Sequence, residues 1–252
     1  MQQVQEHVLK ISRVIDETPS VKAFQLELPE NAKIDFYPGQ FYMVSFVDEP
    51  EIKVSRAYSI ASSPLNKEYI EIALDKVGIF TTKLFSKKAG DFLKFKGPYG
   101  KFYFNEEIKN DLVLIAGGTG ITPLIGIARY CNDKKLSNKI KLIYSVKIPN
   151  EIVYRNEIDS LKKANKNFDY LVTITRAEEQ SNGERVSSRT SQVTNWNGRK
   201  GRIDLELLKE NINGIENSIY FLCGSKEFVD SIINMLIDLG VKKEQIKTDV
   251  WG

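Results

Sequence analysis

A four-residue segment, Arg56-Ala57-Tyr58-Ser59, combines side chains that could hold a ligand with both a phosphate and a flat ring. A guanidinium forms paired hydrogen bonds with phosphate oxygens. A tyrosine two residues further along a strand faces the same side and offers a stacking surface, and Ser59 adds a hydroxyl that can donate or accept. The alternative is an ordinary strand with the arginine outward and the tyrosine packed.

A second segment, residues 76–82, places Gly78 directly before the only helix expected in this half, around residues 80–88. Free backbone N–H groups at a helix N-terminus attract anions, and Thr81 adds a hydroxyl. Thr81 or Thr82 could instead cap its own helix. An arginine and a helix N-terminus in one half of the chain together favour a shared pyrophosphate site.

A glycine-rich segment, residues 117–123, follows an apolar strand at 111–116 and leads into a helix. Dinucleotide phosphates bind at this position in doubly wound α/β domains. Gly118 and Gly120 match the spacing of the dinucleotide motif, and Pro123 replaces its last glycine in a place that suits a first helical turn. A tight strand-to-helix turn without a ligand is the alternative.

Cys223 and Gly224 end another apolar strand, residues 218–224. The carboxyl ends of parallel strands line one crevice, so this pair could face the same ligand as the glycine-rich segment. A free cysteine more commonly packs as a small apolar residue, and we assign that role to Cys131. Trp251 could stack on a ring or cover the core.

Two kinds of element must position these residues. The first hundred residues predict five or six short strands separated by Pro and Gly. Within residues 69–75, Ile70, Ile72 and Leu74 share one face, which is typical of a strand buried on one side only. Beyond residue 110, apolar strands alternate with helices, which predicts parallel βαβ units.

We therefore predict two domains, an antiparallel β-barrel over residues 1–107 and a parallel-sheet α/β domain over residues 108–252. A polar stretch at 177–195 is expected to form a surface excursion.

The composition limits the chemistry. The chain has 252 residues, with 36 Lys and Arg against 33 Asp and Glu, a balance that does not indicate nucleic-acid binding. Two cysteines and one histidine cannot supply the four thiolates of a [2Fe–2S] cluster, and we expect no metal site. No apolar run is long enough for a membrane span, and a cytoplasmic location is expected. An enzyme with so few reactive side chains would depend on a bound cofactor.

Taken together and in order, four motifs resemble the ferredoxin–NADP reductase family: Arg56-Ala57-Tyr58-Ser59, Gly78 to Thr81, Gly118 to Pro123 and Cys223-Gly224. That family includes reductase components of oxygenases and the flavin domains of flavohaemoglobins. The resemblance covers nearly the whole chain. It implies an N-terminal six-stranded flavin-binding barrel and a C-terminal domain that binds a nicotinamide nucleotide. It also implies FAD, with FMN as the alternative, and NADPH or NADH.

The resemblance also implies residue roles. Arg56 would contact the flavin pyrophosphate, Tyr58 would lie against the isoalloxazine, and Ser59 would lie near its N5. The candidate catalytic residues are Ser59, Tyr58 and Cys223. The candidate cofactor-binding residues are Arg56, Ala57, Tyr58, Ser59, Gly78, Ile79, Phe80, Thr81, Thr82, Gly118, Thr119, Gly120, Pro123, Lys147, Arg176, Cys223, Gly224 and Trp251. Of these, Lys147 and Arg176 would bind a 2′-phosphate, which slightly favours NADPH.

The function implied is hydride transfer from NAD(P)H to a flavin, followed by release of single electrons to an acceptor. That acceptor would be a separate iron–sulfur or haem protein, such as a ferredoxin or an oxygenase component. The alternative is a non-catalytic flavin- or nucleotide-binding subunit of a larger electron-transfer complex. Some subunits of that kind carry a cysteine-bound cluster near the C-terminus, and this chain lacks those cysteines.

Overall fold

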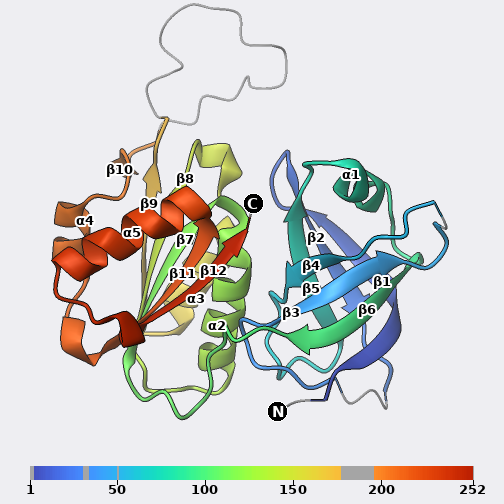
Figure 1. The fold of residues 1–252 in the computed structure, drawn as a ribbon, viewed down its shortest axis with the longest axis horizontal. Helices are drawn as coiled ribbons and strands as arrows, with labels where there is room; N and C mark the ends of the chain where they lie inside the picture. The colour runs from blue at the N-terminus through green and yellow to red at the C-terminus, as the bar shows by residue number, and fades with distance from the viewer. Residues whose placement is uncertain (1–2, 31–33, 50, 177–195, 252) are drawn as a thin grey trace, which may run out of the picture.

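The computed structural model describes residues 3–30, 34–49, 51–176 and 196–251. The surface excursion predicted at 177–195 lies outside these residues. Two six-stranded sheets form the two halves of the molecule, which lie side by side (Figure 1).

The first half is an antiparallel barrel, as predicted. Its strands are β1 (Gln5–Asp16), β2 (Val21–Glu27), β3 (Phe41–Phe46), β4 (Arg56–Ser59), β5 (Tyr69–Asp75) and β6 (Phe92–Tyr99). They pair in the order β4-β3-β6-β1-β2-β5, and a bridge between Ile60 and Ile72 brings the two edges together. Helix α1 (Ile79–Phe85) is shorter than the predicted 80–88, because the N–H groups of Ser86 and Lys87 donate to carbonyls three residues earlier and the α-helical pattern stops there.

Strand β5 departs from the prediction of a strand buried on one side only. Ile70, Ile72 and Leu74 face the barrel core as expected. Glu71 and Ala73 on the opposite face are also buried, with Glu71 only 2% exposed. The second half of the molecule covers this outer face. The alternating sequence pattern of β5, which is typical of a strand with one face in solvent, therefore belongs here to a strand at the interface between the two halves.

The second half is a parallel sheet with helices on both faces, also as predicted. Its strands are β7 (Asp111–Gly117), β8 (Ile140–Val146), β9 (Phe168–Ile174), β10 (Arg199–Lys200), β11 (Ser218–Ser225) and β12 (Ile246–Trp251). They lie in the order β10-β9-β8-β7-β11-β12. Strand β10 could not be predicted from the sequence, because two charged residues leave no periodic signal.

Two apolar layers flank this sheet. Leu112 and Leu114 of β7 pack with residues of α2 (Ile121–Asp133) and α3 (Arg155–Ala164). Val113 and Ile115 pack on the other face with residues of α4 (Leu205–Asn211) and α5 (Lys226–Asp238). Such burial on both faces explains the continuous apolar run of β7. Within the described ranges, no helix is both long and apolar enough to cross a membrane.

Candidate active site

Strand β4 carries the first motif at the edge of the barrel. Arg56 and Ala57 are exposed, whereas Tyr58 and Ser59 are half-buried. The Tyr58 ring packs against Phe80, with 6.2 Å between ring centroids, so Phe80 supports Tyr58 from the core. Burial raises the pKa of Tyr58 to about 12, which keeps its hydroxyl protonated at neutral pH. The Arg56 guanidinium donates to the Ser55 carbonyl at 3.2 Å.

The hydroxyl of Thr81 organises the turn before α1. Its Oγ1 accepts from the backbone N–H groups of Val77 (2.8 Å) and Gly78 (2.9 Å) and donates to the Gly78 carbonyl (3.1 Å). A hydroxyl has one proton and two lone pairs, so Thr81 is fully engaged within this turn. Thr81 thus forms the local hydrogen bonds that the capping alternative proposed.

The rest of this segment presents backbone to the surface. The N–H groups of residues 79–81 occupy the first helical turn, where no intrahelical acceptor exists. The exposed Thr82 donates its own N–H to the Gly78 carbonyl at 2.8 Å. A Cβ added to Gly78 would meet no atom within 4 Å, so there is open space beside the turn. Val77 and Ile79 flank it with side chains that are 78% and 84% exposed.

The glycine-rich segment divides into a face toward a cavity and a face toward the core. Gly118 has φ +55°, in the left-handed region, and a Cβ there would meet open space. Gly118 and Thr119 line the cavity. Gly120 and Pro123 are buried, and a Cβ on Gly120 would lie 2.2 Å from the Cys223 carbonyl oxygen. Gly120 therefore allows the start of α2 to pack directly against β11.

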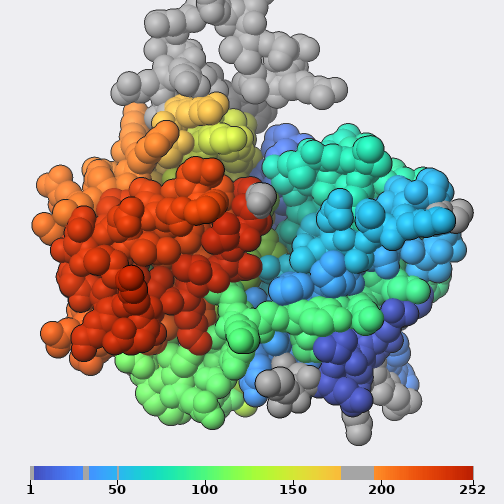
Figure 2. Space-filling view, viewed as in Figure 1, coloured from blue at the N-terminus to red at the C-terminus, as the bar shows by residue number. Residues whose placement is uncertain are grey.

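The cavity lies between the two halves and has a volume of about 400 Å³, within the range of small-molecule sites. Figure 2 shows the hollow between the barrel and the C-terminal half. Most of its walls are at the carboxyl ends of the parallel strands, and the barrel supplies three residues. The lining residues are Ser20, Val21, Asp75, Gly117, Gly118, Thr119, Ser145, Val146, Lys147, Glu151, Val153, Thr175, Ser225, Phe228 and Trp251.

The two predicted phosphate-binding cations lie next to each other. The Arg176 N–H donates to the Lys147 carbonyl at 2.9 Å, in the extension of β8 and β9. Both residues are exposed, and Lys147 lines the cavity whereas Arg176 lies beside it.

Cys223 and Gly224 are buried behind the glycine-rich segment and do not line the cavity. Burial, with the Asp249 carboxyl nearby, raises the pKa of the Cys223 thiol well above its ordinary value. Cys223 is therefore a protonated thiol and not a thiolate nucleophile.

Asp249 is a site residue that the sequence analysis missed. Its Oδ2 lies 3.4 Å from the Ser59 Oγ of the barrel and 3.9 Å from the Cys223 Sγ of the parallel sheet. Burial raises the pKa of Asp249, and the hydrogen bonds from Ser59 and Cys223 offset part of that rise. Asp249 and Trp251 are two residues apart in a predicted strand, so the alternation that gives them a shared face could have revealed it.

These features fit two nucleotide-like ligands that meet at one place. The open turn before α1 and the exposed Arg56 lie on the barrel, and the cavity beside Gly118 lies on the parallel sheet. Asp249 joins the two halves where β4 and β11 end. Backbone N–H groups, a guanidinium and glycines without nearby atoms are suited to pyrophosphate.

Comparison with known proteins agrees with this geometry. The model of the oxidoreductase FAD-binding domain matches residues 8–104, and that of the oxidoreductase NAD-binding domain matches residues 114–233. The chain is 29% identical over 95% of its length to the sulfhydrogenase 1 subunit gamma of Pyrococcus furiosus, of which it covers 77%. It is 26% identical over 92% of its length to one of the subunits of the Na⁺-translocating NADH-quinone reductase of a Marinomonas species, and it covers 64% of that subunit.

Solved structures share the whole fold. A ferredoxin NADP⁺ reductase from Neisseria gonorrhoeae with bound FAD and NADP matches with a TM-score of 0.77 and 23% identity, covering 99% of both chains.

A barrel followed by a doubly wound domain, with a cavity between them, defines the class of two-domain flavoprotein oxidoreductases that use nicotinamide nucleotides. Within that class the chain belongs to the ferredoxin–NADP reductase family, with an FAD-binding and an NAD-binding domain.

Proposed function

We propose that this chain is a reductase that accepts hydride from NAD(P)H on FAD and passes electrons singly to a separate acceptor protein. The observation that carries the proposal is the contact of Asp249 with both Ser59 and Cys223. It brings the motif strand of the barrel to the carboxyl end of β11, so ligands held by the two halves would meet there. We also propose the domain limits 1–107 and 108–252, which fall between β6 and β7.

Each half contributes its own set of binding groups. On the barrel, Arg56 and the backbone of Gly78, Ile79, Phe80 and Thr81 would hold the FAD pyrophosphate, with Tyr58 against the flavin ring. On the parallel sheet, Gly118 and Thr119 would hold the phosphates of the nicotinamide nucleotide. Bound FAD supplies the capacity to accept a hydride and to release electrons one at a time.

The protein groups at the junction between the two halves hold the ligands in position and do not themselves react. The Cys223 thiol keeps its proton because burial raises its pKa. The Ser59 hydroxyl donates to the Asp249 carboxyl, which fixes the direction of its remaining lone pairs. The Asp249 carboxyl also places a negative charge at this junction when it is ionised, and such a charge favours positive charge developing on a neighbouring ring.

The proposed preference for NADPH rests on Lys147 and Arg176. Their backbones are hydrogen-bonded and both side chains are exposed at the edge of the cavity. Two cations at this position favour a phosphate dianion over a ribose hydroxyl. Glu151 in the same wall supplies an acceptor that suits a ribose hydroxyl, so a moderate preference is expected.

The acceptor is proposed to be a separate iron–sulfur or haem protein. Both cysteines of the chain are buried free thiols, and two thiolates cannot hold a [2Fe–2S] cluster. The relatives are a hydrogenase subunit and a quinone reductase subunit by name, which supports a partner that carries the next redox centre. Two free cysteines also support the proposed cytoplasmic location.

Anaerobic stopped-flow spectroscopy of the FAD-loaded protein tests the function. Both NADPH and NADH are expected to bleach the flavin absorbance, with NADPH giving the lower Kd. The flavin released by denaturation is expected to be FAD by chromatography. FAD-loaded protein that neither nucleotide reduces would refute the catalytic proposal and would favour a non-catalytic subunit.

A further inference from the structure

Helix α2 touches the barrel directly beside Ser59. A Cβ added to Gly126 would lie 2.6 Å from the Ile60 carbonyl oxygen and 3.3 Å from the Ala61 carbonyl oxygen. These two residues follow Ser59 at the end of β4. One turn further along α2, the Arg129 Nη1 donates to the same Ala61 carbonyl at 2.7 Å. Two successive turns of one helix are therefore seated on the strand end that carries Ser59.

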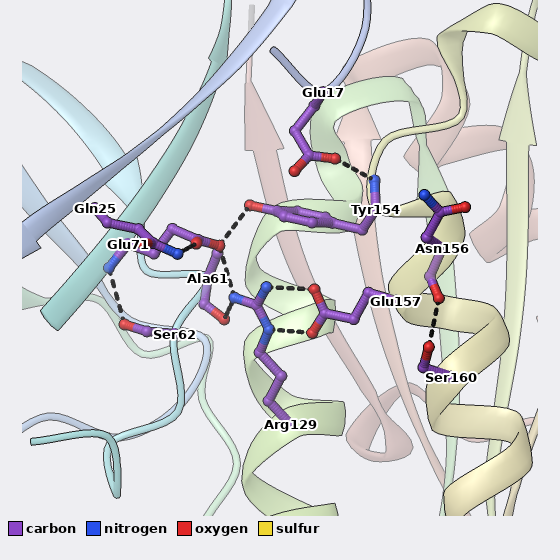
Figure 3. Close-up of polar contacts among 10 residues, drawn as sticks. All are labelled: Glu17, Gln25, Ala61, Ser62, Glu71, Arg129, Tyr154, Asn156, Glu157 and Ser160. Atoms are coloured by element: carbon purple, nitrogen blue, oxygen red, sulfur yellow. Dashed lines mark hydrogen bonds and ion pairs between the residues drawn. The ribbon is translucent and has the colours of Figure 1, made fainter. Parts of the chain in front are cut away.

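Arg129 is held from both halves of the molecule at once, as Figure 3 shows. From the barrel, Glu71 Oε1 accepts from Nη1 at 2.8 Å. From the parallel-sheet half, the two carboxylate oxygens of Glu157 accept from Nε and Nη2. The Tyr154 ring lies 4.9 Å from the guanidinium carbon, and the Tyr154 hydroxyl donates to Glu71 at 3.1 Å. We call Glu71, Arg129, Tyr154 and Glu157 the interdomain cluster.

The interdomain cluster is buried and specific in its geometry. The Arg129 side chain is 14% exposed and the Glu71 side chain 2%. A planar guanidinium that forms two parallel bonds with one carboxylate and two more with other acceptors fixes both distance and angle. Glu71 has no other cation within ion-pair distance in the part of the chain that the structure describes. Loss of Arg129 would leave this carboxylate buried without a counter-charge.

The same helix carries the nucleotide-binding segment at its other end. α2 begins directly after Gly120, whose backbone packs against the Cys223 carbonyl oxygen. A helix rises about 1.5 Å per residue, so Arg129 lies about 14 Å along the axis from Gly120. A straight helix of this length is a rigid connection. The barrel contact at Gly126 and Arg129 therefore fixes where the segment Gly118 to Gly120 stands relative to Ser59.

We propose that Gly126 and Arg129 are positioning residues for hydride transfer, which seat α2 on the barrel and so set the approach of the nicotinamide nucleotide to the flavin. The inference rests on the proposed function. Neither residue lines the cavity, and both act through α2. Rates of oriented reactions fall by about a hundredfold for a displacement of about 1 Å, whereas binding at a site held within one domain changes less. The expected signature is a lowered reduction rate with retained binding.

The experiment compares Arg129→Gln, Arg129→Lys and Gly126→Ala with the wild type. Lys162→Met is the matched control, because it removes a cation that is half exposed and pairs with Asp169 within the parallel-sheet half. Limiting rates of flavin reduction come from stopped-flow spectroscopy. Kd values for FAD and for NADP⁺ come from calorimetry, and hydrogen–deuterium exchange reports on residues 59–61 and 124–131.

We expect Arg129→Gln and Gly126→Ala to lower the limiting rate about 30- to 100-fold while both Kd values change less than about threefold. Arg129→Lys keeps the charge but loses the paired geometry, and recovers part of the rate. Exchange is expected to rise at residues 59–61 in Arg129→Gln and Gly126→Ala, and to stay unchanged in the control.

Limiting rates within twofold of wild type in Arg129→Lys and Gly126→Ala would overturn the proposal, as would an equal loss in Lys162→Met. If Arg129→Gln does not fold, the limiting rate of flavin reduction in Gly126→Ala tests the proposal. Wild-type protein that binds FAD but is not reduced refutes the proposed function. The exchange data then test the seating of α2 separately, because unchanged exchange at residues 59–61 would overturn it.

Discussion

The Asp249 side chain contacts both halves of the molecule, at the place where we propose that hydride transfer occurs. Its pKa is raised above the ordinary value of 3.8, chiefly by burial. We expect the limiting rate of flavin reduction to rise with pH as Asp249 ionises, because its carboxylate favours developing positive charge on a nicotinamide ring. Asp249→Asn is expected to lower the rate about tenfold and to remove this pH dependence.

Stopped-flow reduction across the acidic and neutral pH range measures this effect. Asp238→Asn, an exposed position at the end of α5, controls for the loss of one charge. An Asp249→Asn protein with the wild-type pH profile would contradict the assignment.

Thr81 gives a second prediction at the residue scale. Its hydroxyl satisfies the N–H groups of Val77 and Gly78, and Thr81→Val would leave both without that acceptor. A hydrogen bond contributes about 0.5–1.5 kcal/mol net, so with both bonds lost the turn should loosen and the Kd for FAD should rise about tenfold.

Titration of the apoprotein with FAD, followed by quenching of flavin fluorescence, gives the Kd. Thr81→Ser keeps the hydroxyl and is expected to bind like the wild type. Equal Kd values for Thr81→Val and Thr81→Ser would show that the hydroxyl has no part in shaping the turn.

At the scale of elements, the junction of η1 (Gly118–Gly120) and α2 depends on the absence of a side chain at Gly120. A Cβ there would meet the Cys223 carbonyl at 2.2 Å, so Gly120→Ala must separate α2 from β11. Overpacking of this kind costs about 1–3 kcal/mol. Urea denaturation should show this loss.

Gly78→Ala is the matched comparison for stability, because its Cβ would enter open space and its φ of −175° is extended backbone. We expect its free energy of unfolding to stay within about 0.5 kcal/mol of the wild type. A similar loss in both variants would rule out the close packing on Cys223 as the cause.

At the scale of the whole molecule, acidic groups at the interface predict a pH effect on stability. Glu17 accepts a hydrogen bond from the Tyr154 N–H across the interface at 3.0 Å. Burial raises the pKa of Glu17 above 4.5, the Tyr154 bond and Arg129 lower it in part, and the charges of Glu71 and Glu157 raise it further. The folded state therefore holds the proton at a pH where the unfolded state has released it, and stability falls as pH rises through this window.

Glu17→Gln removes that proton equilibrium. We expect the Tm of Glu17→Gln minus that of the wild type to increase as pH rises from about 4 to 8. Glu210→Gln, at an exposed position on α4, controls for the loss of a surface charge. A difference that does not change with pH would show that Glu17 does not couple to unfolding.

Much of this architecture could be predicted from local sequence. Helix α2 follows the glycine-rich segment as predicted, because the glycines before it and Pro123 in its first turn mark its start. The apolar runs at 111–116 and 218–224 predicted strands of a parallel sheet, and residues of both strands are buried on both faces of that sheet. These signals lie within each segment, so no knowledge of its partners is needed.

Features that depend on distant segments could not be predicted in the same way. The alternation in β5 placed Glu71 toward solvent, but Arg129 of α2 and Tyr154, directly before α3, cover it from the other half. The pairing of Cys223 with Asp249 follows from the strand order of the sheet, which no single segment reveals. The roles of the cofactor-binding residues stay predictions, although the structure brings Gly118, Thr119, Lys147 and Trp251 to one cavity.

The two halves share an apolar cluster in addition to the core that each has of its own. One apolar cluster contains residues of α2 and β7 together with four residues of the barrel, Val21, Ala23, Ala61 and Ala73. Exchange of one half for that of a relative, as in a chimaera built to change the electron donor, would therefore join surfaces that were not selected together. A successful chimaera would have to carry these small barrel residues together with α2. The two sides of the interface match each other, so neither half can be exchanged alone.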